Sequence, residues 1–203
     1  MQDKMTEQDI ARLFTRADGS YLFARWGRPI VPVVFGVADE TLAVVKSAIE
    51  AVVVLAGHRM AEIDTELGAN LMVFFIQDWA ELTATPNLDQ LIPDLVGVCD
   101  RLQAADANQY RAFRFDEAGA IKAAFVFLRM DAHLSALPAA DIALSQAVQV
   151  ICLWADRISP LAALEGVAVL RADVAAVIRA AYASHMPEVA HDPSHALRLL
   201  ARI

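Results

Sequence analysis

Residues 141–156, DIALSQAVQVICLWAD, form the stretch around which we interpret the rest of the chain. Apolar side chains recur there at helical spacing, and the polar groups inside the stretch are one hydroxyl and two amides, on Ser145, Gln146 and Gln149. We expect a helix that packs on a β-sheet. Its polar groups form either a polar site or a buried hydrogen-bond cluster, because buried polar side chains are nearly always hydrogen-bonded.

The sequence before this helix predicts a sheet of about four or five strands, mixed or antiparallel. The run from 70 to 76 is apolar on both faces, which is typical of a central strand. Two runs flank the turn residues 116–119 and form the clearest antiparallel hairpin. Prolines at 29 and 32 lack N–H groups, so the strand that they begin belongs at a sheet edge. The expected strands cover residues 30–35, 59–64, 70–76, 109–115 and 121–130.

Helical spacing marks several further segments, and together with the strands it predicts the fold class α+β. Residues 1–20 are polar and predict an N-terminal arm or short helix, whereas residues 21–203 suit a single α+β domain. No internal repeat or linker divides them. The additional helices are expected at residues 41–55, 88–104, 173–182 and 192–203.

Composition excludes some classes of partner. The chain has 25 acidic and 17 basic residues and a net charge of −8, so a clustered basic surface for nucleic acid is not expected. Hydrophobic residues make up 57% of the chain, yet no uninterrupted apolar run reaches the roughly 18–20 residues of a transmembrane helix. The apolar excess therefore predicts a large core or contact with a partner, either another protein or peptide or a second copy in a homodimer.

The N-terminal residues 1–9 lack the apolar region of a secretory signal. As written, the chain is expected in the cytoplasm, and in the periplasm if a signal peptide preceded it.

Cys99 and Cys152 lie in apolar helical contexts without CxxC spacing, which favours buried free thiols over a disulfide or metal pair.

No cofactor is predicted. The GxGxxG and GxxxxGK[ST] patterns of nucleotide sites do not occur. The histidines His191 and His195 have i, i+4 spacing, but Pro193 places the first of them before its helix, so we predict no metal site there.

The C-terminal half resembles an uncharacterised bacterial family of zincin-like domains, the domain of unknown function 2927 family. The resemblance covers residues 145–156, 169–173, 178–182, Met186 and 195–197, and the segment 25–33 is similar to that family's first strand. The family's pattern at the central helix is E-E-L-x-Q-x-L-G-L-x-N-D. Gln149, Leu153 and Asp156 match it, whereas Cys152 replaces a glycine and Ala155 an asparagine.

The resemblance implies a metallopeptidase-like fold in which the positions equivalent to HExxH are degenerate. Residues 145–149 read SQAVQ, so Ser145 and Gln146 stand where the family has two glutamates. Zinc binds through imidazole, thiolate or carboxylate groups, which a hydroxyl and neutral amides do not replace. The sequence therefore favours a non-catalytic zincin-like domain that binds a protein or peptide partner.

An alternative is a hydrolase of unassigned type with a polar cleft around Ser145, Gln149 and His133. Gln146 completes this set of catalytic candidates, although no GxSxG elbow is present. A purely structural homodimer module is a third interpretation.

Ligand-binding candidates lie outside the central helix as well. Arg25, Trp26 and Arg28 form a cation–aromatic group that could bind an anion or could cover a sheet edge. Asp156, at the end of the central stretch, is a further ligand-binding candidate. On the hairpin, three arginines could line a groove or mark its solvated face; these are Arg111, Arg114 and Arg129.

Overall fold

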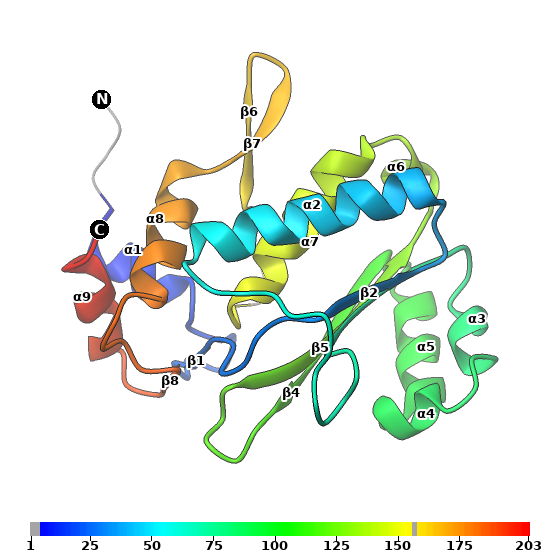
Figure 1. The fold of residues 1–203 in the computed structure, drawn as a ribbon, viewed down its shortest axis with the longest axis horizontal. Helices are drawn as coiled ribbons and strands as arrows, with labels where there is room; N and C mark the ends of the chain where they lie inside the picture. Colours follow the sequence, from blue (N-terminus) through cyan, green and yellow to red (C-terminus); the bar gives the residue numbers. More distant parts are fainter. Residues whose placement is uncertain (1–4, 156–157) are drawn as a thin grey trace.

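The computed structural model describes residues 5–155 and 158–203. Its centre is a mixed four-stranded sheet in the order β2-β3-β5-β4 (Figure 1). The strands β2 (Pro32–Phe35), β3 (Leu71–Ile76) and β5 (Ile121–Arg129) are mutually parallel, and β4 (Gln109–Phe115) runs antiparallel to β5 at one edge. The predicted α+β class and mixed sheet are thus confirmed.

Alternation along the strands separates two hydrophobic layers. Ala124, Val126 and Leu128 of β5 face one layer, whereas Phe125 and Phe127 face the other. Helices α2 (Asp39–Leu55) and α7 (Ala139–Ile151) cover the first face. Three short helices cover the second: α3 (Ala80–Thr83), α4 (Leu88–Leu91) and α5 (Leu95–Ala104). Because both faces of β5 are buried, its sequence is apolar almost throughout.

The positions of β2 and β3 in the sheet are those that the sequence predicts. The strand β2 lies at the sheet edge, as its prolines predict, and β3 is central. Gly36 ends β2 with φ +81°, and a Cβ atom there would lie 2.0 Å from the carbonyl oxygen of Phe75. This close approach leaves room only for glycine.

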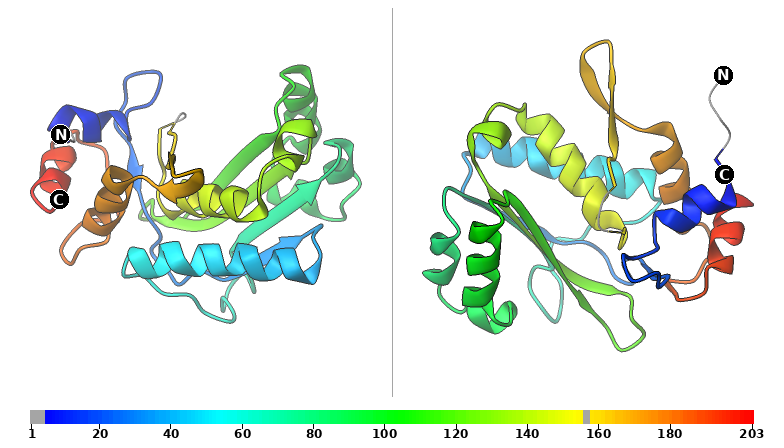
Figure 2. Two further views of the ribbon diagram at one scale, coloured as in Figure 1. Left: turned by 90° about the horizontal axis from the view of Figure 1, so that it is seen from above. Right: turned by 180° about the vertical axis from the view of Figure 1, so that it is seen from behind.

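The N-terminal helix and the last two helices lie together on one side of this three-layer body (Figure 2). The helix α1 (Glu7–Arg12) packs against α9 (Ser194–Leu200), and α8 (Ala172–Ala181) lies beside α9. The short strands β1 (Phe23–Ala24) and β8 (Val189–Ala190) pair with each other. A separate hairpin consists of β6 (Leu161–Leu164) and β7 (Val167–Leu170), and α6 (Ala132–Ser135) precedes α7.

Three sequence predictions were wrong in detail. Residues 59–64 form isolated bridges in a loop instead of a strand. The central helix spans Ala139–Ile151 and not residues 141–156, because Cys152 is extended and the N–H of Leu153 donates to the carbonyl of Ala24 at 2.8 Å. The helix predicted at residues 88–104 is divided into α4 and α5, because Ile92 is extended.

Cys99 and Cys152 are buried free thiols, as predicted. In residues 5–155 and 158–203, none of the helices combines the length and apolar character that crossing a bilayer requires.

Candidate functional site

A groove of about 510 Å³ runs along the edge strand β4. All of β4 lines one side of it. The other side comes from the end of α7, the extended segment that follows α7, and the segment that follows α1. The residues of that second side are Arg16, Gln149, Leu153, Trp154 and Ala155.

Strand β4 presents an unpaired backbone edge to this groove. The N–H of Arg129 donates to the carbonyl of Asn108 at 2.9 Å, which fixes the phase of the antiparallel ladder. Because residues of an antiparallel strand alternate between bonding to the partner and pointing away, Gln109, Arg111 and Phe113 direct their N–H and C=O groups away from β5. The order of the described strands places no strand beyond β4. The carbonyl of Phe113 accepts a hydrogen bond from Nη1 of Arg114 at 3.1 Å, and the other outward groups can pair with an added strand.

The side chain of Arg111 lies between β4 and α7. Its Nη1 donates to Oε1 of Gln146 at 3.0 Å and to Oε1 of Gln109 at 3.4 Å. The two glutamines also bond to each other, from Nε2 of Gln146 to Oε1 of Gln109 at 2.8 Å. In the described part of the chain, the acceptors of Arg111 are therefore neutral amides.

Burial lowers the pKa of the Arg111 guanidinium, although the group stays protonated at any physiological pH. A cation that has lost part of its hydration is stabilised by an anion more than by amide oxygens. Arg16, on the opposite side of the groove, supplies a second positive charge. The groove is therefore electrostatically suited to a carboxylate.

The opposite side of the groove is held by contacts with distant segments. Trp154 stacks on Phe14 with 5.2 Å between ring centroids, and its Nε1 donates to the carbonyl of Val148 at 2.7 Å. Nε2 of Gln149 donates to the carbonyl of Ile158 at 3.1 Å. These contacts fix the aromatic ring and the amide before any ligand arrives.

The structure brings only part of the predicted catalytic set to the groove. Gln149 lines it, and Gln146, which is buried, reaches it through Arg111. Ser145 is half-buried on α7, and His133 is exposed on α6; neither belongs to the groove lining. No group of three or more His, Cys, Asp or Glu side chains among the described residues is arranged to hold a metal ion.

The predicted cation–aromatic group is dispersed. Trp26 is fully buried, and its Nε1 donates to the carbonyl of Val150 at 2.8 Å. Arg25 lies over the ring of Tyr182, 5.0 Å from its centroid, and pairs with Glu188 at 3.6 Å. Arg28 joins a separate ion-pair network. Asp156, the fourth ligand-binding candidate, lies outside the described residues.

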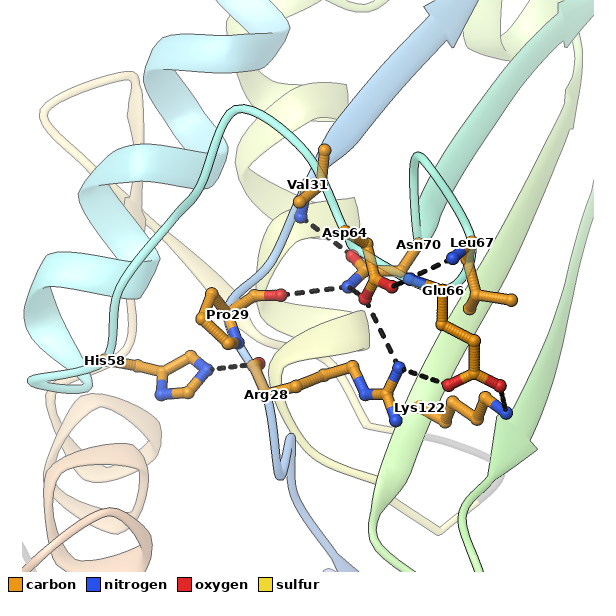
Figure 3. Close-up of polar contacts among 9 residues, drawn as sticks. All are labelled: Arg28, Pro29, Val31, His58, Asp64, Glu66, Leu67, Asn70 and Lys122. Atoms are coloured by element: carbon orange, nitrogen blue, oxygen red, sulfur yellow. Dashed lines mark hydrogen bonds and ion pairs between the residues drawn. The ribbon is translucent and has the colours of Figure 1, made fainter.

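The ion-pair network around Arg28 ties the loop of residues 57–70 to the start of the sheet (Figure 3). Nη1 of Arg28 lies 3.4 Å from Asp64 and 3.0 Å from Glu66, and Lys122 also pairs with Glu66. Burial alone would raise the pKa of Asp64. Hydrogen bonds from the N–H groups of Leu67 and Glu66, from the Asn70 amide and from Arg28 lower it to about 2.

Each acidic oxygen in this network already accepts bonds from the protein. The network therefore holds the loop in place, and the groove along β4 remains the better candidate site.

Sequence reasoning identified Arg111 as a possible groove residue but did not identify Arg16 or Trp154. Arg111 and Arg114 face opposite sides of β4, because Arg114 donates to the carbonyl of Leu91 and lies over the ring of Phe125. Arg16 and Trp154 come from segments far apart in the sequence, so no local spacing connects them to β4.

Comparisons of the chain with protein-family models, with curated proteins and with solved structures gave no match.

Proposed function

We propose that the chain is a non-catalytic, zincin-like domain that binds an extended acidic segment of a partner protein as an additional strand on β4. The observation that carries this proposal is the groove in which an unpaired strand edge, Arg111 and Arg16 lie together. Main-chain hydrogen bonds to a strand edge supply affinity for any extended peptide, and side-chain pockets supply the selection.

The charges select the peptide. An acidic side chain that enters the groove meets Arg111 from β4 and Arg16 from the opposite side. Alternate residues of an added strand point to the same face, so acidic groups at every second position would face the arginines. The remaining positions would point to the opposite face of β4, where Tyr110 and Ala112 line the groove.

The zincin-like part of the proposal is supported by the order of the elements. The β4–β5 hairpin precedes α7, an order similar to that of zincin-type domains, and α7 presents Gln149 to the groove. Gln146 and Gln149 carry amides that hydrogen-bond within the protein. Neutral amides are poor zinc ligands, which supports a binding role over metal-dependent hydrolysis.

The test uses a synthetic, end-capped heptapeptide of alternating glutamate and valine, titrated into the full chain. We expect binding, together with slower hydrogen exchange at the N–H groups of Gln109, Arg111 and Phe113. The variant Arg111→Gln should bind about tenfold or more weakly, because a charge-assisted hydrogen bond contributes roughly 1.5–3 kcal/mol. Arg101→Gln is the matched control, since Arg101 is exposed on α5 and pairs with Asp94.

Two further peptides separate the parts of the proposal. The same peptide with alternate amides N-methylated should not bind, because it cannot complete the ladder with β4. A lysine–valine peptide should bind weakly or not at all. Equal binding of the N-methylated peptide would reject strand addition, equal binding of the lysine peptide would reject the acidic preference, and stoichiometric zinc in the purified protein would reject the non-catalytic assignment.

A further inference from the structure

The β6–β7 hairpin projects from the body of the molecule (Figures 1 and 2), and among the strands in residues 5–155 and 158–203 its two strands pair only with each other. Its turn consists of Glu165 and Gly166, both with positive φ (51° and 82°), which is the geometry of a type I′ hairpin turn. All residues of the two strands are Ala, Val or Leu. Leu164 and Val167, which face each other across the turn, are each 62% exposed.

Such a hairpin requires a covering surface. An isolated two-stranded hairpin is marginally stable in water, and both outer edges of this one carry unpaired backbone groups. Side chains alternate between faces, so Leu164 and Val167 share one face with Ala162 and Val169. This face is a continuous apolar surface that extends from the tip to the root.

A concave surface begins where that face ends. A cleft of about 850 Å³ lies between α1, α8, the C-terminus and the root of the hairpin. Ala162 belongs to both the hairpin face and the cleft lining. The other residues that line the cleft are Met5, Asp9, Arg12, Leu13, Arg171, Ala172, Asp173, Ala176 and Ile203.

We infer that the chain forms a twofold homodimer in which the β6–β7 hairpin of each copy lies across that of its partner and places its tip in the partner's cleft. A twofold interface uses one self-complementary surface, and a protrusion adjoining a concavity of the same molecule is such a surface. The hairpin extends roughly 13 Å from its root to its turn at about 3.3 Å per residue, which allows its tip to reach beyond a central axis.

The charges near the hairpin permit a second copy as the occupant. The net charge of −8 opposes association of two copies, and the uncharged strands of the hairpin limit this repulsion at the contact. The hairpin carries a single charged residue, Glu165 at its tip. Arg12 and Arg171 lie in the cleft and are each paired with an aspartate that also lines it, Asp9 and Asp173. Both guanidinium groups keep exposed surface that can contact the Glu165 carboxylate as well. This inference does not depend on peptide binding along β4.

The first experiment is sedimentation velocity of the full chain at micromolar concentration. We expect a mass of twice the 22.1 kDa of the chain. Leu164→Asp/Val167→Asp should weaken the association by about a hundredfold or more, because two apolar side chains at the centre of the contact are replaced by charged ones. Ala176→Trp, which fills the cleft and leaves the hairpin unchanged, should also give a monomer.

The control for these variants is Ile63→Asp, since Ile63 is 68% exposed in the loop of residues 57–70. It should sediment as the wild type does. Far-ultraviolet circular dichroism and melting temperature identify any variant that fails to fold. A monomeric wild type, or a hairpin variant that folds and still dimerises, would overturn the inference.

Cysteine cross-linking tests the arrangement of the two copies. Both natural cysteines are buried, so introduced thiols would react selectively. The double variant Glu165→Cys/Arg12→Cys should form a covalent dimer on mild oxidation. Glu165→Cys alone should not, because the two hairpin tips lie in opposite clefts. A dimer with Glu165→Cys alone would show tip-to-tip pairing and would overturn insertion into the cleft.

Discussion

Asn70 joins three segments through one buried side chain. Its Oδ1 accepts a hydrogen bond from the N–H of Val31 at 2.7 Å, and its Nδ2 donates to the carbonyl of Pro29 and to Asp64, each at 2.9 Å (Figure 3). The residue is fully buried, so water cannot replace these partners. The start of β2, the start of β3 and the loop of residues 57–70 therefore depend on a single amide.

Replacing this amide should be costly. We predict that Asn70→Ala lowers the free energy of unfolding by about 2–4 kcal/mol, because it leaves the N–H of Val31 and the carbonyl of Pro29 buried without their partner. Urea denaturation followed by circular dichroism measures the change. Gln90→Ala, an exposed amide on α4, should change stability by no more than about 0.5 kcal/mol. A similar small effect of both substitutions would contradict this role for Asn70.

His195 predicts a dependence of stability on pH. It is 3% exposed and lies 4.4 Å from the ring of Phe23, and its Nδ1 lies 2.8 Å from the hydroxyl of Tyr21. Burial, assisted by the charge of Arg198, lowers the pKa of the imidazole to about 4. The unfolded chain takes up a proton near the ordinary pKa of 6.5, whereas the folded protein does so only near pH 4.

The contribution of this histidine is therefore complete above pH 6.5 and is lost as the pH falls from 6.5 to about 4. We expect the loss to approach roughly 3 kcal/mol at the acidic end of this range. Urea titrations at several pH values measure it as the difference between wild type and His195→Gln, which removes the titrating group. His133→Gln, at an exposed position, should retain the wild-type slope. An equal slope in His195→Gln would exclude His195 as the cause.

At the scale of elements, the sequence predicted best those segments whose pattern is local. The β4–β5 hairpin has a turn sequence and two alternating strands, and β3 has a doubly buried apolar run. The prediction that prolines place β2 at the sheet edge was also confirmed, because a proline lacks its N–H group whatever its neighbours are.

The incorrect elements were those that depend on distant partners. The central helix ends at Ile151 because the next residues bond elsewhere, Leu153 to Ala24 and Ala155 to Leu13. Residues 59–64 alternate as a strand would, but the Asp64–Asn70 contact holds them in a loop.

The candidate site also contains residues that a local pattern reveals and residues that only the fold brings together. Gln146, Gln149 and Arg111 were recognisable because each is polar within an apolar segment. Arg16 and Trp154 reach the groove through the packing of α1 and of the segment after α7, and this arrangement exists only in the folded chain.

At the scale of the whole molecule, the two chain ends belong to the main core. The helix α1 packs on α9, and the N-terminal residues Ile10 and Phe14 are fully buried in the same hydrophobic cluster as the sheet and α7. Phe14 also supports Trp154, a residue of the groove. Within the predicted N-terminal arm or short helix, the described residues 5–20 thus contribute packing to the candidate site.

This connection predicts that Phe14→Ala affects stability and binding together. Removing a fully buried phenylalanine should lower the free energy of unfolding by about 3–5 kcal/mol, and circular dichroism and tryptophan fluorescence should report one shared transition. Under conditions where the variant is folded, the glutamate–valine peptide should bind more weakly, because Trp154 has lost its stacking partner.

Phe35→Ala is the matched control. Phe35 is 44% exposed and stacks on Phe74, and it lies on β2, the edge strand at the other side of the sheet from β4. Phe35→Ala should lower the free energy of unfolding less than Phe14→Ala does and should leave peptide binding unchanged. If Phe14→Ala instead produced an early transition by one probe and left the second unchanged, α1 would be a separable arm. The groove would then be formed by residues 21–203 alone, and Arg16 would have no fixed place opposite Arg111.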